Sequence, residues 1–67
     1  MNLKDLLRII PGYTLIYLVG SSGTIYAEDV KAKLVDYKFH ECIVDYMEVT
    51  GEGELFIIII DEFMAKS

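Results

Sequence analysis

His40, Glu41 and Cys42 are the only tight group of side chains in this sequence that suits metal binding or nucleophilic chemistry. On a strand, His40 and Cys42 would share one face and could supply two metal ligands. A zinc site needs about four ligands, and the chain has a single histidine and a single cysteine. We therefore interpret the pair as a strand-edge histidine and a buried thiol, and we expect neither a metal nor a cofactor. A metal site shared between subunits remains the alternative.

Catalysis by Cys42 would need an accessible thiolate and an activating base. His40 is close in sequence, but on an extended strand the two Cα atoms would lie about 7 Å apart. No donor for an oxyanion is evident beside them. We therefore assign no catalytic residue and predict that the protein is not an enzyme.

Two further polar patterns have ordinary structural interpretations. Gly20-Ser21-Ser22-Gly23 resembles an anion-binding loop, but no lysine follows it and the chain continues as a strand, which indicates a hairpin turn. Several carboxylates near the C-terminus could form a weak divalent-cation patch, although they lack the order of a calcium loop and favour a solvated acidic end. These carboxylates are Glu48, Glu52, Glu54, Asp61 and Glu62.

The apolar run Leu55–Ile60 is the element around which the rest must be arranged. It is too short for a membrane helix, which needs about 20 apolar residues, and isoleucine suits a strand. Alternation places apolar side chains on both faces of this strand, so we predict a central strand that is covered on both sides.

A short amphipathic helix is predicted over 2–10. Its apolar positions, at helical spacing, are Leu3, Leu6, Leu7 and Ile10. Asn2 is a suitable N-cap, and Pro11-Gly12 ends the pattern. A helix this short is not stable alone, so it must dock on another element.

Three more strands complete the expected elements: 13–19, 24 to about 30, and 42–49. The connector from 28 to 41 fits either helix or strand, and we favour a strand to about Val30 followed by one loose helical turn at 31–37. Thr50-Gly51-Glu52-Gly53 predicts a tight turn before the isoleucine run. Residues 61–67 form a short tail with no strong pattern.

Side-chain faces depend on strand register, which loop length controls. With Ser21-Ser22 at the tip of the first hairpin, Tyr13, Tyr17, Tyr26 and Val30 would share a face. With a two- or four-residue second loop, Ile43, Met47 and Val49 would share a face with Phe56 and Ile58. Asp45 would then lie among these apolar side chains, unless a position at the edge of the sheet leaves it exposed to solvent. A three-residue loop would invert this assignment.

These elements predict a single small α+β domain over 1–67, in which a short N-terminal helix packs on a mostly antiparallel four-stranded sheet made of two hairpins. A nine-residue helix is roughly 13 Å long, whereas such a sheet is about 15 Å across. The helix therefore leaves one apolar face over, which predicts an association surface. The residues that we assign to that interface are Tyr13, Leu15, Tyr17, Tyr26 and Val30.

Composition also favours association. The chain has 67 residues, 54% of them hydrophobic, and one cysteine, so an internal disulfide is impossible. A domain of this size buries only about 60% of its unfolded surface and often needs a partner. A net charge of −5 argues against binding nucleic acid or an anionic membrane. Because Asp5 and Arg8 interrupt the first apolar positions, we expect no export signal and a cytoplasmic location.

Four segments of the chain together resemble a group of small bacteriophage and prophage proteins. The segments are Leu3-Lys4-Asp5-Leu6-Leu7, Thr14 to Val19, Ser22-Gly23-Thr24-Ile25-Tyr26 and Leu55 to Ile60. Proteins of that group are short, acidic and of uncharacterised function, and they begin with a Leu-Lys-Asp-Leu-Leu helix. The resemblance implies a small α+β fold in a host cytoplasm, and it implies no activity and no functional residues.

The sequence therefore favours a non-enzymatic structural or interaction module that forms a homo-oligomer or contacts another protein. Burial of the apolar sheet face, or pairing of edge strands, would supply the contact. The alternative hypothesis is an acidic regulator that binds and inhibits a nucleic-acid-binding host protein.

Overall fold

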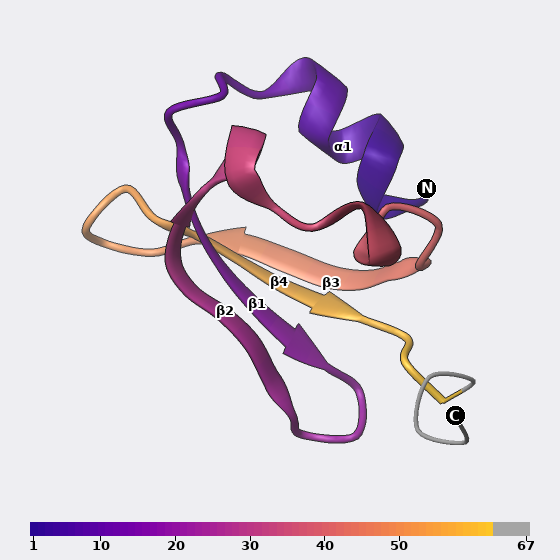
Figure 1. Cartoon of the computed structure of the whole chain (residues 1–67). Helices are drawn as coiled ribbons and strands as arrows, with labels where there is room; N and C mark the ends of the chain where they lie inside the picture. The colour runs from indigo at the N-terminus through magenta and orange to yellow at the C-terminus, as the bar shows by residue number, and fades with distance from the viewer. Residues whose placement is uncertain (63–67) are drawn as a thin grey trace.

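The computed structural model describes residues 1–62, which form one helix, four strands and two 3₁₀ turns (Figure 1). In chain order, these elements are α1 (Leu3–Ile9), β1 (Leu15–Gly20), β2 (Ile25–Lys31), η1 (Ala32–Leu34), η2 (Tyr37–Phe39), β3 (Val44–Val49) and β4 (Leu55–Ile59).

The four strands form one sheet in the order β2-β1-β4-β3. The pairs β1–β2 and β3–β4 are antiparallel hairpins, while β1 and β4 run parallel at the centre, from Ile16 opposite Leu55 to Gly20 opposite Ile59. The predicted α+β fold with a mostly antiparallel four-stranded sheet is thus confirmed. β4 lies between β1 and β3, so the predicted central position of the isoleucine strand is confirmed. The prediction that this strand is covered on both sides is wrong for residues 1–62, where the helical elements pack on one side of the sheet only.

The N-terminal helix begins and ends where its sequence predicts. The side chain of Asn2 accepts a hydrogen bond of 2.9 Å from the backbone N–H of Asp5, which makes it the N-cap. Leu3 and Leu6 are buried, and the helix stops before Pro11, since a proline disfavours helical backbone in the residue before it. Because seven residues cannot hold a helix alone, docking stabilises α1.

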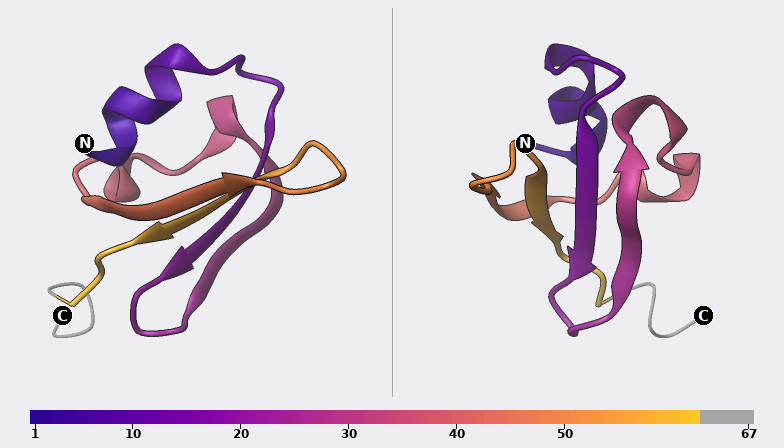
Figure 2. Two further views of the ribbon diagram at one scale, coloured as in Figure 1. Left: turned by 180° about the vertical axis from the view of Figure 1, so that it is seen from behind. Right: turned by 90° about the vertical axis from the view of Figure 1, so that its left-hand side faces the viewer.

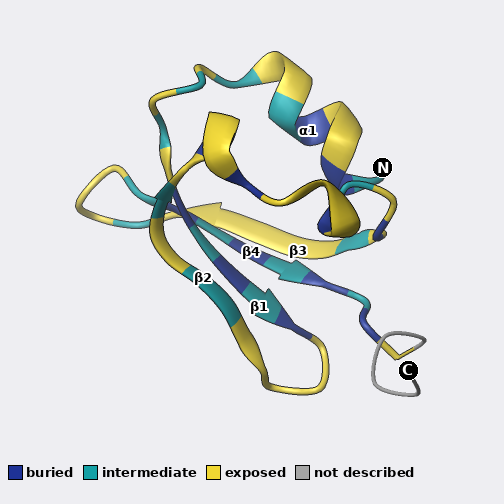
Figure 3. Cartoon of the chain, viewed as in Figure 1, coloured by how far each residue is buried: buried dark blue, intermediate teal, exposed yellow. Residues whose placement is uncertain are grey.

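The hydrophobic core lies between one face of the sheet and a layer made of α1, η1 and η2 (Figure 2). We call this side of the sheet the inner face. Its strand residues alternate with more exposed ones, which is the dark blue and teal pattern along β1 and β4 in Figure 3. The buried apolar residues are Leu3, Leu6, Ile16, Leu18, Ala32, Val35, Phe39, Cys42, Leu55, Ile57 and Ile59.

The predicted register of the first hairpin is wrong. Val19 pairs with Ile25 and Leu18 with Ala27, and there are irregularities on either side of Leu18. Such bulges insert extra residues into one strand and reverse its faces. Asp29 absorbs part of this distortion with a φ of 56°. The consequence is that Tyr26 and Val30 pack against the core rather than sharing a face with Tyr17.

The second hairpin also differs from the preferred register. Met47 lies opposite Ile57 and Val49 opposite Leu55, so both face the inner side instead of joining Phe56 and Ile58. The loop between β3 and β4 spans five residues, 50–54. Its length is odd, as in the three-residue alternative, so the side chains of β3 lie on the opposite faces from those expected with a two- or four-residue loop. Asp45 lies at a register shift on this edge strand and is exposed.

The connector contains both predicted features. β2 continues to Lys31, one residue beyond the expected strand end, and η1 supplies the loose helical turn. A second turn, η2, was not predicted; the side chain of Asp36 caps it by accepting a 2.9 Å hydrogen bond from the N–H of Lys38. From residue 63 onward, the predicted tail lies outside the described residues. Among residues 1–62, no helix has the length and apolar character needed to cross a membrane.

Candidate interaction surface

The side of the sheet opposite α1 carries a continuous set of apolar side chains, which we call the outer face. Cross-strand pairing places seven apolar residues on it: Leu15, Tyr17, Val19, Ile25, Tyr46, Phe56 and Ile58. Ile25, Tyr46 and Leu15 are 54%, 48% and 41% exposed, and the other four are half-buried. In the part of the chain that the structure describes, α1, η1 and η2 pack on the inner face, so the outer face is left open. Contiguous exposed apolar patches of this kind mark association sites.

Two aromatic rings occupy the middle of the outer face. Tyr17 on β1 and Phe56 on β4 are register partners, and their ring centroids lie 5.7 Å apart with the planes inclined by 25°. This offset stack fixes both rings in place. Tyr46 lies further out on β3, where a hydrogen bond with Glu48 raises the pKa of its hydroxyl.

Carboxylates gather at the end of the outer face where β1 and β4 begin. A hydrogen bond with the neighbouring Asp29 raises the pKa of Glu54, and desolvation and the charges of Glu52 and Glu28 raise it further. One carboxylate oxygen of Glu54, Oε2, is buried and has no hydrogen-bond partner. The acidic charge is therefore at one end of the outer face rather than spread along it.

The five residues predicted for the interface are divided between the two sides of the sheet. Leu15 and Tyr17 lie on the outer face. Tyr13 precedes β1 and is 73% exposed, whereas Tyr26 and Val30 pack against the core for the reason given above. Five outer-face residues were not assigned to the interface: Val19, Ile25, Tyr46, Phe56 and Ile58. Strict alternation in the apolar runs could have identified Phe56 and Ile58, but not Ile25, whose face depends on the bulges.

The structure gives His40 and Cys42 separate environments. Cys42 is fully buried, and its burial raises the pKa of the thiol, with the charge of Asp61 acting in the same direction. A buried thiol with a raised pKa is of the unreactive kind. His40 Nε2 lies 3.3 Å from the carbonyl oxygen of Val35, and its ring lies against Tyr37, with centroids 4.8 Å apart. Residues 1–62 contain no group of three or more side chains arranged to hold a metal ion.

Asp61 occupies a buried site that the sequence analysis missed. Its carboxylate accepts hydrogen bonds from the hydroxyls of Ser21 (3.0 Å), Ser22 (2.6 Å) and Tyr26 (2.5 Å), and from the backbone N–H of Ser22 (3.0 Å). These hydrogen bonds hold the pKa of Asp61 well below its ordinary value, and the bond from the Ser22 hydroxyl has the largest effect. Burial acts in the opposite direction, because it disfavours the charged carboxylate. Asp61 is therefore not part of an acidic patch with Glu52 and Glu54, which lie at the opposite end of β4.

Gly20 makes room for this carboxylate. A Cβ atom at position 20 would lie 2.7 Å from Cε2 of Tyr26 and closer still to the carboxylate of Asp61. The Gly-Ser-Ser-Gly turn is thus a hairpin turn, as predicted, and its serines also bind the end of the C-terminal strand. An acidic residue directly after a buried strand and a serine-rich turn were the two signals that could have predicted the contact.

Comparison with family models, with curated proteins and with solved structures finds no match to this chain. The resemblance to small phage and prophage proteins therefore stays a prediction, as does the absence of enzymatic activity.

Proposed function

We propose that this protein is an interaction module that self-associates by packing the outer faces of two copies against each other. The observation that carries the proposal is the open outer face, where seven apolar side chains lie on a sheet with a covering layer on its other side only. Each half-buried side chain on such a face gains roughly 25 cal/mol per Å² of apolar area when a partner excludes water.

The chain length supports association. A sheet domain of 67 residues with no possible internal disulfide has a marginal core, and oligomerisation is one of the few remaining sources of stability. Tyr17, Tyr46 and Phe56 are the residue types that interfaces favour, because aromatic rings add contact area at low entropic cost.

A second copy fits the charge distribution better than an unrelated acidic protein would. The carboxylates of Asp29 and Glu54 lie at one end of the outer face, and Glu48 lies opposite Phe56. In a two-fold arrangement in which the two β1 strands run in opposite directions, the acidic ends are far apart and the apolar centres meet.

The test is the mass in solution from about 1 µM to about 1 mM, measured by light scattering after gel filtration. We expect the unaltered protein to dimerise within this range. Ile25→Glu, on the outer face, should weaken the dimer at least tenfold, the cost of burying an unpaired charge. Ile9→Glu is the matched control, because Ile9 is 71% exposed on α1.

Three results would overturn the proposal. They are a monomer over the whole range, an equal effect of Ile25→Glu and Ile9→Glu, or a dimer that Ile25→Glu leaves intact, which would point to the edge strand β3. Circular dichroism establishes that each variant is folded. If Ile25→Glu unfolds, Leu15→Glu tests the same face at another exposed position.

A further inference from the structure

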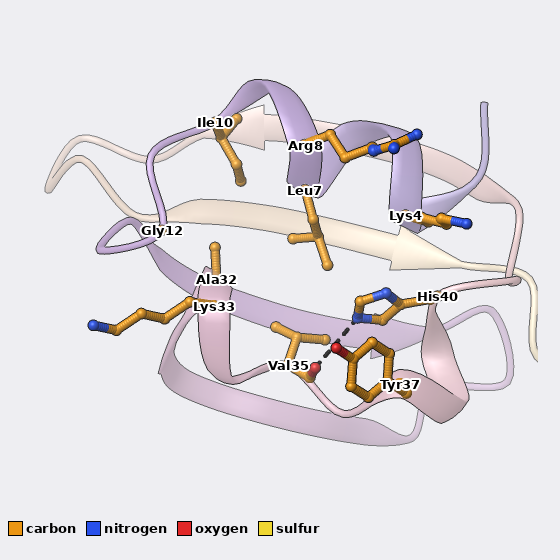
Figure 4. Close-up of a pocket in the computed structure, with 10 residues that line it drawn as sticks. All are labelled: Lys4, Leu7, Arg8, Ile10, Gly12, Ala32, Lys33, Val35, Tyr37 and His40. Carbon is orange, nitrogen blue, oxygen red and sulfur yellow. Dashed lines mark hydrogen bonds between the residues drawn. The ribbon is translucent and has the colours of Figure 1, made fainter.

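A groove on the helical side of the molecule is unrelated to the outer face (Figure 4). It has a volume of about 360 Å³ and lies between α1 and the connector. Leu7 and Ile10 reach down from the helix toward Ala32 and Val35, and together they form an apolar floor. We call this feature the basic groove, for the charges described next.

The walls of the basic groove carry an unusual share of the positive charge. Lys4, Arg8 and Lys33 line it, which is three of the six lysines and arginines in the chain, and so does the single histidine, His40. All 11 aspartates and glutamates lie within residues 1–62, and none of them lines the groove. In a protein with a net charge of −5, this is a local reversal of sign over an apolar floor.

His40 is held in place within the groove. A carbonyl oxygen can only accept a hydrogen bond, so the 3.3 Å contact between His40 Nε2 and the oxygen of Val35 requires a proton on Nε2. The other ring nitrogen lies on the side of the ring toward α1 (Figure 4). Tyr37 packs against the ring and limits its rotation.

We propose that the basic groove binds a small organic anion with an apolar body, such as an aryl or short alkyl carboxylate. The floor would take the apolar part, while Lys4 and Arg8, which extend toward the same end of the groove, would hold the acid group through charge-assisted hydrogen bonds (Figure 4). Lys33 extends at the opposite end and adds only its longer-range positive charge. The volume is in the range of small-ligand sites and well below what a folded partner would fill. The apolar lining excludes a bare inorganic ion as the best occupant, since such an ion would leave the floor hydrated.

The experiment is an NMR titration of the ¹⁵N-labelled full chain with 4-phenylbutanoate, with 4-phenylbutanamide as the neutral control of nearly the same shape. We expect the acid to bind with a dissociation constant of about 1 mM or below. The shifts should concentrate at Leu7, Gly12, Ala32 and Val35. The amide should bind at least tenfold more weakly, and added salt should weaken binding of the acid.

Charge variants give the second arm. Arg8→Gln should weaken binding of the acid by about threefold to tenfold, the loss expected for one charge-assisted contact at a partly solvated site. Lys31→Gln is the matched control: it removes one positive charge from β2, outside the groove, and should change the affinity less than twofold.

Equal binding of acid and amide would overturn the proposal, as would shifts on the outer face instead of the groove, or no shift at ligand concentrations of about 10 mM. Binding of an acidic apolar peptide without binding of 4-phenylbutanoate would overturn the assignment to a small ligand. Since Arg8 is exposed, its substitution leaves the fold intact and keeps the test decisive.

Discussion

The carboxylate of Asp61 accepts a 2.5 Å hydrogen bond from the hydroxyl of Tyr26, a residue 35 positions earlier in the chain. Ser21 and Ser22 bind the same carboxylate. The end of β4 is therefore tied to the hairpin of β1 and β2 by a buried charge whose partners are hydroxyls and one backbone N–H.

Asp61→Asn should lower the free energy of unfolding at neutral pH. The folded state holds the pKa of Asp61 below its ordinary value of 3.8, so its stabilising effect is full above that value and is lost as the pH falls below it. The stability difference between the unaltered protein and the variant should therefore shrink toward about pH 3. Urea denaturation at neutral pH and at about pH 3 measures this stability difference. Asp45→Asn is the control, because Asp45 is exposed and its substitution should leave stability nearly unchanged.

Glu54→Gln should have the opposite effect and raise the free energy of unfolding at neutral pH. The pKa of Glu54 is raised in the folded state, first by the hydrogen bond with Asp29. A raised carboxyl pKa favours the folded state while the group is protonated, and this contribution is lost as the pH rises through the folded value. The gain from Glu54→Gln should therefore disappear under acidic conditions. A gain that persists there, or one equal to that of exposed Glu41→Gln, would contradict this explanation.

Gly20→Ala should destabilise the fold by about 1–3 kcal/mol, because the new methyl group meets Tyr26 and the carboxylate of Asp61. Gly51→Ala is the control, since a Cβ there has no neighbour within 4 Å. Chemical denaturation compares the two variants. Equal stability would show that the site of Asp61 can expand without cost.

Leu6→Ala should lower the free energy of unfolding by about 2–5 kcal/mol, as for other fully buried leucines. Leu6 lies on the buried side of α1 and is 1% exposed, whereas Ile9 on the same helix is 71% exposed. Ile9→Ala should therefore change the free energy of unfolding by less than about 0.5 kcal/mol. Thermal denaturation followed by circular dichroism distinguishes them. A small effect of Leu6→Ala would mean that helix docking contributes little.

The elements could be predicted because their signals are local. The spacing of Leu3, Leu6 and Leu7, the cap at Asn2 and the unbroken apolar run in β4 each depend on a few neighbouring residues. The central position of β4 also followed from its apolar composition, since strands with apolar residues on both faces favour the middle of a sheet.

Face assignments failed where the strands are irregular. The register shifts next to Leu18 move side chains of β2 to the other side of the sheet, and no residue type marks them. In the second hairpin, the five-residue loop 50–54 inverts the faces of β3 relative to the preferred register. The buried Asp61 and the basic groove were missed for a different reason. Both join segments far apart in the sequence. The serine-rich turn and the acidic residue after the apolar run were signals for the Asp61 contact, but neither signal by itself indicates that the two segments meet.

The order of the strands has a consequence for synthesis on the ribosome. β4 is made last among the four strands, yet it lies at the centre of the sheet between β1 and β3. Until it emerges, β1 has one unpaired edge and the hydroxyls of Ser21 and Ser22 lack their carboxylate. Stable folding of the sheet must therefore wait until β4 has emerged, and in that interval the nascent protein exposes a strand edge to other chains.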